Sequence, residues 1–406
     1  MGSEWRETTI GAEVLLQRGF DITRKEQRPG SVPVVSSGGP SSLHDIAAAK
    51  GPGVVLGRKG VVGSVYFVKD DYWPHDTTLW VRDFKGNDPR FVYYFFLSIA
   101  SVLAQLDVGS ANPTLNRNHV HPMKVWWPEL DEQRRIARIL GTLDDKIELN
   151  RRTNETLEAM ARALFKSWFV DFDPVRAKAA GRQPEGMDAD TAALFPDSFE
   201  ESELGETPRG WRAGTLGDLC QLNPEAWSRH TRPALIKYVD LSNTKWGRIE
   251  AVAHYIPEEA PSRAQRVLRV GDTIVGTVRP GNGSYALISA EGLTGSTGFA
   301  VLRPLGRTCT EFVYLAATSK DNIDALSLLA DGGAYPAVPP GDILATPVAR
   351  PPDLLLGRFS SIASGFLRMV ALSNAQSLVL SCLRDGLLAN LLSGPDLSGV
   401  GGGPCQ

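Results

Sequence analysis

The chain has 406 residues, enough for two or three domains of about 150 residues each. Hydrophobic residues at 42% and charged residues at 22% are ordinary for a soluble globular protein, and a net charge of −3 excludes a chain that is basic throughout. The four cysteines form no CxxC pair, MGSEWRETTI contains no apolar run, and no stretch is expected to approach a membrane span. We therefore expect a cytoplasmic protein with no signal peptide.

Residues 1–130 are predicted to form a loop-rich α/β domain. The stretch GPGVVLGRKGVVGSVYFV, from Gly51, places β-branched strand residues on either side of a glycine-rich turn that carries Arg58. Two further polar loops are SSGGPSS, from Ser36, and GSANPTLNRN, from Gly109. Glycine permits close backbone approach, cations suit a phosphate backbone, and Asn, Ser and Thr suit base edges. These loops are candidate DNA contacts, although a β-turn that simply needs glycine is the alternative for any one of them.

A long helix is predicted over residues 131–170. Residues 131–169 contain no proline, and apolar or small residues recur at steps of four and three, as in a heptad seam. At roughly 39 residues, or about 58 Å, this helix is too long and too polar on its other faces for an ordinary core helix, so it needs a partner. Its seam consists of Ile136, Leu140, Leu143, Ile147, Asn150, Asn154, Leu157, Ala161, Leu164 and Trp168.

Residues 171–208 are predicted to be a linker, because they are rich in Pro, Gly and acidic residues; we expect surface loop with short helical turns. Its PDSFEESE stretch has no accompanying lysine and is interpreted as solvated linker rather than a nuclease metal site. Residues 209–350 then repeat the pattern of the first domain. RVGDTIVGTVRPGNGSYALI, from Arg269, again sets strand residues around a glycine-rich turn, and the polar loop RPGNGS begins at Arg279.

Residues 351–395 are predicted to form a second long helix, and residues 396–406 a flexible tail. Laid over the first helix without gaps, the second helix has apolar residues where the first has them, and serines where the first has Asn150 and Asn154. Self-similarity of this kind predicts an internal duplication. The second seam consists of Phe359, Phe366, Val370, Ser373, Ser377, Leu380, Leu387 and Leu391.

Tandem copies can pair about a pseudo-twofold axis, which predicts that the two helices form an antiparallel coiled coil. Only full overlap sets polar residues against polar residues, with Asn150 facing Ser377 and Asn154 facing Ser373. A buried polar layer of this kind tends to fix the register of a helix pair. The predicted fold is therefore α/β (α+β), with two tandem loop-rich domains that are each followed by a long helix.

The second helix has weaker positions. Arg384 interrupts its apolar seam, and it fits the antiparallel pair only if its side chain reaches Asp144 or Asp145 on the first helix. Gly365 and Gly386 each weaken the helix by about 1 kcal/mol relative to alanine.

No catalytic constellation is found. GVVLGRKG lacks the spacing of a phosphate loop, and the chain contains no Gly-x-Ser-x-Gly elbow, dinucleotide fingerprint or amino-methyltransferase motif. His119 and His121 have no neighbouring ligands in the sequence and are interpreted as solvated or strand-end histidines rather than a metal site. We predict no catalytic residue, metal or cofactor in this chain. The candidates for DNA contact are Ser36, Ser37, Arg58, Lys59, Asn112, Thr114, Asn116, Arg117, Lys237, Lys245, Arg279, Asn282, Ser284 and Tyr335.

The junction of Pro128, Glu132 and Gln133, leading into IARILGTLDDKIE, is the most specific motif of the chain. Together with GPGVVLGRKGVVGSVYFV, HDTTLWV and GSANPTLNRNHV, it resembles the specificity subunit of type I restriction–modification systems, over nearly the whole chain. The resemblance implies two target recognition domains, each reading one half of a split DNA sequence. It also implies helices that set the spacing and dock two modification subunits, to which restriction subunits attach. S-adenosylmethionine, ATP and Mg are then expected on these partners, with no catalysis in this chain.

The second half departs from this pattern, since RPPDLLLGRF, from Arg350, lacks the Glu-Gln of the junction. Weaker docking of a modification subunit there is the implied consequence. Two alternatives stay open. A self-contained methyltransferase or nuclease with unrecognised motifs would be active as the purified chain, and a coiled-coil assembly protein would show no salt-dependent DNA binding. Two divergent loop-rich domains favour the specificity subunit, because a scaffold has no need for them.

Overall fold

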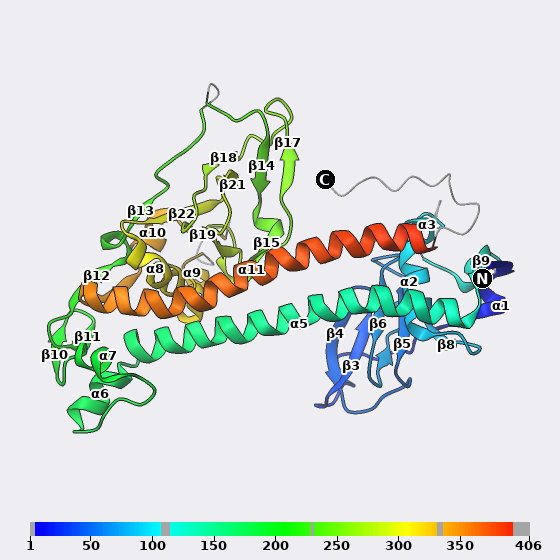
Figure 1. The fold of residues 1–406 in the computed structure, drawn as a ribbon, viewed down its shortest axis with the longest axis horizontal. Coiled ribbons are helices and arrows are strands. Elements are labelled where there is room, and N and C mark those ends of the chain that lie inside the picture. Colours follow the sequence, from blue (N-terminus) through cyan, green and yellow to red (C-terminus); the bar gives the residue numbers. More distant parts are fainter. Residues whose placement is uncertain (1–4, 107–113, 229–230, 331–335, 393–406) are drawn as a thin grey trace. The chain divides into compact units, whose positions relative to one another are not determined.

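The computed structural model gives the fold of most of the chain (Figure 1). The residues that it describes are 5–106, 114–228, 231–330 and 336–392. Two of the candidate DNA contacts, Asn112 and Tyr335, lie outside the described residues, as does the tail at 396–406.

The chain divides into two compact units. Unit 1 is Met1–Leu149 with Gln376–Cys405, and unit 2 is Asn150–Ala375. Each unit contains one strand-rich head and a part of each long helix. This division differs from the linear order of domains and helices expected from the sequence, because each long helix contributes to both units.

The head of unit 1 contains two small sheets. The four-stranded sheet has the order β2-β8-β5-β6, the three-stranded sheet has the order β4-β3-β7, and β1 pairs with β9, so the beginning and the end of the head lie side by side. The strands are β1 (Trp5–Thr9), β2 (Leu15–Arg18), β3 (Val32–Ser36), β4 (Gly39–His44), β5 (Gly53–Gly57), β6 (Val65–Val68), β7 (Trp73–Pro74), β8 (Thr78–Asp83) and β9 (Lys124–Pro128). The helices are α1 (Ile10–Glu13), α2 (Pro89–Ser98), α3 (Ala100–Gln105) and α4 (Arg117–Val120).

The core of this head forms around β5 and α2. Strand β5 is buried at every position, as expected for an apolar β-branched run in the middle of a sheet. Helix α2 begins after Asp88, whose carboxylate accepts two backbone N–H bonds of the first turn at 2.9 Å. The rings of Phe91 and Phe95 then pack against Trp127, with centroids 5.2 and 4.6 Å apart. Burying a side chain of this size, relative to leaving it exposed to water, stabilises the fold by about 1.5–3 kcal/mol.

The head of unit 2 repeats this topology. Its sheets have the orders β13-β22-β19-β20 and β17-β14-β21-β18, and β12 pairs with β23 as β1 pairs with β9. The duplication therefore extends through the heads, where few sequence letters are shared. The strands are β12 (Arg212–Thr215), β13 (Cys220–Leu222), β14 (Ile236–Val239), β15 (Thr244–Lys245), β16 (Arg248–Ile249), β17 (Ala253–Tyr255), β18 (Ala264–Val267), β19 (Thr273–Gly276), β20 (Tyr285–Leu287), β21 (Leu293–Ser296), β22 (Phe299–Pro304) and β23 (Pro347–Arg350). The helical segments are η1 (Leu216–Asp218), η2 (Leu241–Asn243), η3 (Pro280–Asn282), η4 (Arg307–Cys309), α8 (Thr310–Ala317), α9 (Lys320–Ala330) and α10 (Pro340–Leu344).

The segment between the heads is more ordered than the predicted surface linker. It contains the expected short helices, α6 (Asp173–Ala179) and α7 (Ala189–Ala193), and an unforeseen hairpin of β10 (Phe199–Ser202) and β11 (Gly205–Pro208). Three of its apolar side chains, Phe172, Val175 and Phe195, are buried in the main core of unit 2. The expectation of a purely surface segment was wrong, because scattered apolar residues can be buried without any periodic pattern.

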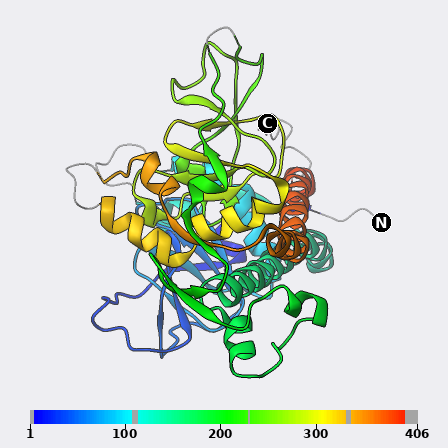
Figure 2. The same cartoon turned by 90° about the vertical axis from the view of Figure 1, so that its left-hand side faces the viewer.

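The two long helices are α5 (Leu130–Phe169) and α11 (Asp353–Leu392), and each has 40 residues. Within unit 2, the Nδ2 atom of Asn154 donates to Oδ1 of Asn374 at 2.8 Å, and the ring of Phe359 lies 4.9 Å from that of Phe169. Rising residue numbers on α5 therefore meet falling numbers on α11, which makes the helices antiparallel in this unit. Figure 2, turned by 90°, shows the yellow helix α8 beside the orange start of α11, and Phe312 of α8 shares a core with Phe359.

Unit 1 shows the same antiparallel order. Ile136 and Leu140 of α5 share a core with Leu388 and Leu392 of α11. Further along α5, Asp144 forms an ion pair with Arg384 of α11 at 2.8 Å, as expected if Arg384 is to fit the seam. This carboxylate also accepts a hydrogen bond from the hydroxyl of Tyr94 on α2, at 2.6 Å.

The polar layer of the seam is buried, because Asn150 and Asn154 are 3% and 2% exposed. Asn154 meets Asn374, one residue from the predicted Ser373, and Asn150 donates to the carbonyl oxygen of Ser373 at 3.4 Å. The predicted register is thus met to within one residue at Asn154. Asn150 and Ser377 belong to different units, and their pairing stays a prediction.

Helix α11 is more apolar than expected. An 18-residue window of this helix reaches a mean hydropathy of 1.4, so by length and composition alone it could cross a membrane. The expectation that no stretch approaches this composition was wrong, because Leu, Val, Ala and Ser replace most of the charged residues found on α5. An apolar composition also occurs in helices that pack inside a soluble protein. On α11, Phe359 and Val370 are buried in the protein.

Candidate nucleic-acid interface

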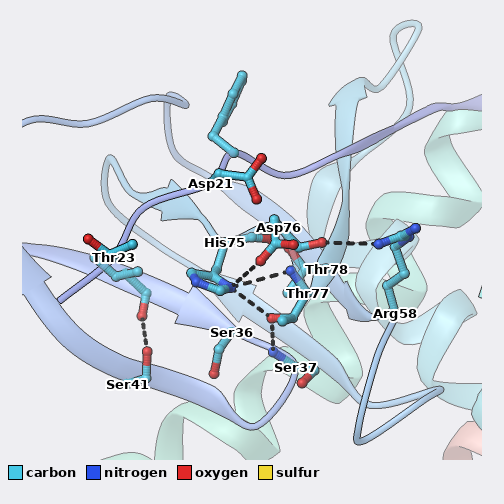
Figure 3. A network of polar contacts seen from close by, with 12 residues as sticks. Asp21, Thr23, Ser36, Ser37, Ser41, Arg58, His75, Asp76, Thr77 and Thr78 are labelled. Atoms are coloured by element: carbon cyan, nitrogen blue, oxygen red, sulfur yellow. Dashed lines mark hydrogen bonds and ion pairs between the residues drawn. The ribbon is translucent and has the colours of Figure 1, made fainter. Parts of the chain in front are cut away.

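Three loops of the first head meet at one end of its sheets (Figure 3). The backbone N–H groups of Arg58 and Lys59, after β5, donate to the carbonyl oxygen of Thr77 at 2.8 and 3.0 Å. The backbone N–H of Ser37, in the β3–β4 turn, donates to the hydroxyl of Thr77 at 3.2 Å. Ser64, which leads into β6, donates through its hydroxyl to the carbonyl oxygen of Ser37 at 2.7 Å. These bonds hold Ser37, Arg58 and Lys59 together on one rigid surface.

The turn at His75 to Thr78 positions these loops; its residues begin the HDTTLWV stretch, but none of them is among the candidate DNA contacts. Thr78 donates through its hydroxyl to the carbonyl oxygen of His75 at 2.7 Å, and the guanidinium of Arg58 donates to the carbonyl oxygen of Asp76 at 3.3 Å. Asp76 also pairs with Arg18 at 3.0 Å. The available signal was local, since HDTT is a run of polar turn-forming residues directly before a strand.

A fourth segment completes the surface. Lys59 forms a β-bridge with Thr114, and the backbone N–H of Leu115 donates to the carbonyl oxygen of Arg58 at 2.9 Å. Lys59 is exposed and Arg58 is half-buried. Of the candidates of the first head, Ser37, Arg58, Lys59 and Thr114 are therefore brought together, with cations beside hydroxyl groups.

The remaining described candidates of this head differ in role. The hydroxyl of Ser36 donates to the carbonyl oxygen of Gly39 at 3.0 Å and so shapes the β3–β4 turn. The side chain of Asn116 accepts the backbone N–H of Asn118 at 2.9 Å, which caps α4. Arg117 is the first residue of α4 and is exposed.

In the second head, four candidates line one cavity of about 420 Å³. They are Lys245, Arg279, Asn282 and Ser284, and Leu241, Ser242 and Val278 complete the lining. Lys237, the remaining described candidate, is an exposed residue of β14 opposite His254 and is not part of this lining.

The two sites occupy equivalent places in the two heads. Ser284 donates to the carbonyl oxygen of Leu241 at 3.1 Å, as Ser64 donates to that of Ser37. The backbone N–H of Val338 donates to the carbonyl oxygen of Thr277 at 2.9 Å, as that of Leu115 donates to Arg58. The loops that follow β5 and β19 are thus held by the same hydrogen bonds.

The charges on these equivalent loops differ. Thr277 takes the place of Arg58, and Arg279 takes the place of Gly60. Both Gly60 and Arg279 have positive φ, +80° and +47°, and this conformation costs an arginine about 1–2 kcal/mol. Strain of this kind is found most often at functional sites. The second head therefore carries the cation Arg279 at a position of positive φ, where the first head has Gly60, the residue type that suits this conformation.

The two histidines of NHVH have separate roles. His119 is exposed, whereas Nε2 of His121 accepts the backbone N–H of Leu16 at 3.0 Å, and burial lowers the pKa of His121. The interpretation of both as solvated or strand-end residues was wrong for His121, which joins the end of the head to β2. Among the residues that the structure describes, no group of three or more His, Cys, Asp or Glu could hold a metal ion.

The junction between the first head and α5 is made by a buried glutamine. Gln133 is 2% exposed, and its Oε1 accepts the backbone N–H of Asp88 at 3.0 Å. Its Nε2 donates to Oδ1 of Asn87 at 2.7 Å and to the carbonyl oxygen of Pro128 at 3.0 Å. The same Asn87 oxygen accepts the indole N–H of Trp127 at 2.8 Å. The junction motif thus connects the start of α5 to the start of α2.

Comparison with known proteins shows what this arrangement resembles. Residues 18–159 match the type I restriction modification DNA specificity domain. The HindI specificity subunit of Haemophilus influenzae is 37% identical over 177 aligned positions, which cover 33% of this chain and 38% of that protein. The MjaIX specificity subunit of Methanocaldococcus jannaschii is 27% identical over 174 positions, which cover 42% of this chain and 36% of that protein. Residues 18–159, which comprise most of the first head and most of α5, therefore resemble the DNA specificity domain of type I restriction–modification systems.

The fold of the chain is also shared with a solved structure. The type I S subunit from M. genitalium superposes with a TM-score of 0.59 and covers 97% of each chain at 14% identity. At that identity the likeness shows the fold alone. The matches to the two curated relatives span 38% and 36% of their lengths, well under half of either protein.

The second junction of the chain, at the start of α11, is apolar. Leu356 takes the place of Gln133, and both Leu355 and Leu356 are fully buried in the core of unit 2. The absence of Glu-Gln in RPPDLLLGRF therefore leaves no gap, because leucine packing replaces the amide hydrogen bonds.

Proposed function

We propose that the chain is the non-catalytic DNA specificity subunit of a type I restriction–modification complex, in which each head reads one half of a bipartite target. The observation that carries the proposal is the pair of equivalent loop surfaces. The two heads hold these loops with the same hydrogen bonds but place their cations differently, at Arg58 and Lys59 in one head and at Lys245 and Arg279 in the other. Equal frameworks with different polar residues suit two different DNA half-sites.

The helices would set the spacing of the half-sites and dock two modification subunits, to which restriction subunits attach. Exposed apolar residues on α11 support such docking: Met369 and Leu372 in unit 2 are 52% and 61% exposed, and Val379 and Leu383 in unit 1 are 59% and 52% exposed. Apolar side chains exposed in this number are typical of a protein–protein contact. S-adenosylmethionine, ATP and Mg would be held by those partners.

The experiment is genome-wide methylation mapping in cells that carry this chain with its modification subunits. A split motif that disappears when the chain is deleted is the expected result. A continuous motif, or methylation that persists without the chain, would contradict the proposal.

The purified chain separates the proposal from the enzyme alternative. Incubated with DNA and S-adenosylmethionine, or with DNA and Mg²⁺, it should neither methylate nor cut. Methyl transfer by the chain alone would favour the self-contained methyltransferase, and an absence of salt-dependent DNA binding would favour the assembly protein.

A further inference from the structure

A tight hairpin in the second head presents an unusual residue at its tip. Strands β15 and β16 pair with Lys245 opposite Arg248, and the two residues between them are Trp246 and Gly247. Both have positive φ, +49° and +85°. A two-residue hairpin loop with positive φ at both positions strongly favours Asn-Gly, because a bulky side chain is strained there. Trp246 therefore occupies a position that the fold alone would give to asparagine.

The indole ring of Trp246 is held in place from one side. Its backbone N–H donates to the carbonyl oxygen of Gly283 at 2.7 Å, and a Cβ added at Gly283 would lie 2.5–2.7 Å from the indole ring atoms. The ring also packs edge-to-face against Tyr285, with centroids 6.0 Å apart. Gly283 is thus the residue that allows the ring to lie flat on the loop, so the ring has little freedom left to lose on binding.

The other side of the ring faces solvent. Trp246 is 56% exposed, whereas the other eight tryptophans, all within the described residues, are buried or half-buried. Its neighbours in the chain and in space line the cavity of the second head. Lys245 directly precedes it, and Asn282 and Ser284 flank the glycine on which it lies.

In the described part of the first head, a helix takes the place of this ring. Its corresponding glycine is Gly63, which precedes Ser64 as Gly283 precedes Ser284. A Cβ at Gly63 would meet the carbonyl oxygen of Ala100 and the backbone of Ala104, both on α3. The glycine of the first head is covered by a helix, and that of the second head by an exposed aromatic side chain.

We propose that Trp246 is a base-contacting residue of the second head, and this rests on the proposed function. The exposed face of the indole packs against bases of the half-site that this head reads, while Lys245 and Arg279 bind the neighbouring phosphates. A rigid aromatic surface beside cations is the arrangement by which proteins stack on or wedge between bases. A purely structural role does not explain the tryptophan, because asparagine suits the turn better.

The test is Trp246→Asn in the complex with the modification subunits, on the bipartite duplex found by methylation mapping. Because the variant restores Asn-Gly, its Tm should be equal to or higher than that of the wild type. Its Kd for the duplex should rise by at least about fivefold, as for loss of one stacked base. The slope of log Kd against log salt should stay unchanged, whereas Lys245→Gln should reduce it by about one.

Leu305→Asn is the matched control. Leu305 is an exposed apolar residue like Trp246, at 59% exposure, and it lies after the last residue of β22. The candidate loop at Thr277 lies beside the first residue of β22, at the opposite end of the strand. This variant should bind as the wild type does. Trp246→Phe should retain part of the affinity, because a smaller ring still stacks.

Unchanged affinity of Trp246→Asn, at wild-type stability, would overturn the inference. So would loss of the modification subunit from the complex, which would make the ring a protein contact. If the wild-type complex binds no bipartite duplex, the proposed function itself fails. If the wild-type complex binds the duplex and Trp246→Asn binds it equally tightly, only the role of Trp246 is contradicted, and the proposed function stands.

Discussion

At the scale of single residues, the chain repeatedly places a strained or polar residue where a simpler one would stabilise the fold. Arg279 has positive φ where the first head has Gly60, and Trp246 occupies a turn position suited to asparagine. At each of these positions, one residue type favours the stability of the fold and another favours DNA binding. Substitutions at these sites should separate the two properties.

Arg279→Gly is the first such substitution. Glycine relieves the positive φ, so the free energy of unfolding of unit 2 should rise by up to about 1 kcal/mol. DNA affinity should fall, and the salt slope of binding should decrease by about one phosphate contact. Denaturant unfolding and binding titrations at several salt concentrations measure both effects. A variant that loses stability would contradict the strain assigned to Arg279, and an unaltered salt slope would show that Arg279 does not contact a phosphate.

Asp188 provides a pH test of the segment between the heads. Hydrogen bonds from the backbone and the hydroxyl of Thr191, together with Arg358 of α11, hold the pKa of Asp188 well below its usual range. A lowered folded-state pKa contributes stability above the unfolded pKa of about 4, and this contribution is lost as the pH falls towards the folded pKa. Asp188→Asn should therefore lower the Tm at pH 7 and flatten its decline below pH 4.

The control for this prediction is Asp190→Asn, which removes the same charge from an exposed position of α7. Its Tm should follow that of the wild type across the pH series. Equal acid profiles for the wild type and Asp188→Asn would contradict the assigned role of Asp188.

At the scale of elements, one pair of equivalent positions, on a head and on the long helix that follows it, carries opposite charges in each half, and the signs are reversed between the halves. In unit 1, Arg90 of α2 forms two hydrogen bonds with Asp145 of α5, at 2.6 and 3.0 Å. In unit 2, the equivalent residues are Glu311 of α8 and Arg368 of α11, which line one cavity. Burial raises the pKa of Glu311, and Arg368 opposes this shift.

This reversal would disfavour docking of a head on the wrong helix. Either mismatched combination brings like charges together, Arg90 with Arg368 or Glu311 with Asp145. A duplicated protein needs such a distinction, because its two heads and two helices otherwise share one packing scheme.

Asp145→Arg tests the ionic contact. Beside Arg90 and Lys69, which also pairs with Asp145 at 3.5 Å, the new arginine should destabilise unit 1 by about 1 kcal/mol. Adding Arg90→Glu recreates the arrangement of the second half and should recover most of that loss. Chemical denaturation of the four proteins of this double-mutant cycle gives the coupling free energy. Additive effects of the two substitutions would mean that the contact is incidental.

At the scale of the whole molecule, the chain consists of two copies of one head-and-helix pattern. Their strand orders match except that the second head adds β18 and the β15–β16 hairpin, and α5 and α11 have the same length of 40 residues. The heads differ in the loops that carry polar residues. Function that resides in such loops should be exchangeable between related chains.

Replacing residues 209–350 with the corresponding head of a relative tests this modularity. Methylation mapping should show one half of the bipartite motif changed and the other half unaltered, with the same spacing. A motif changed in both halves would contradict the assignment of one half-site to each head.

The long helices and the duplication could be predicted from the sequence, because helical periodicity is a local property. The steps of four and three from Ile136 to Trp168, and the polar pair Asn150 and Asn154, needed no knowledge of the rest of the chain. The need of Arg384 for an acidic partner on the first helix also followed, since an antiparallel register leaves Asp144 within reach.

The heads could be predicted only in part. Glycine and cations in sequence identified the loops of Arg58 and Arg279, because turn chemistry is local. Strand order, the buried role of His121 and the support from His75 to Thr78 depend on residues far apart in the chain. The exposure of Trp246 has the same origin: a tryptophan is usually buried, and its position at the tip of a hairpin that lies on Gly283 depends on the tertiary structure.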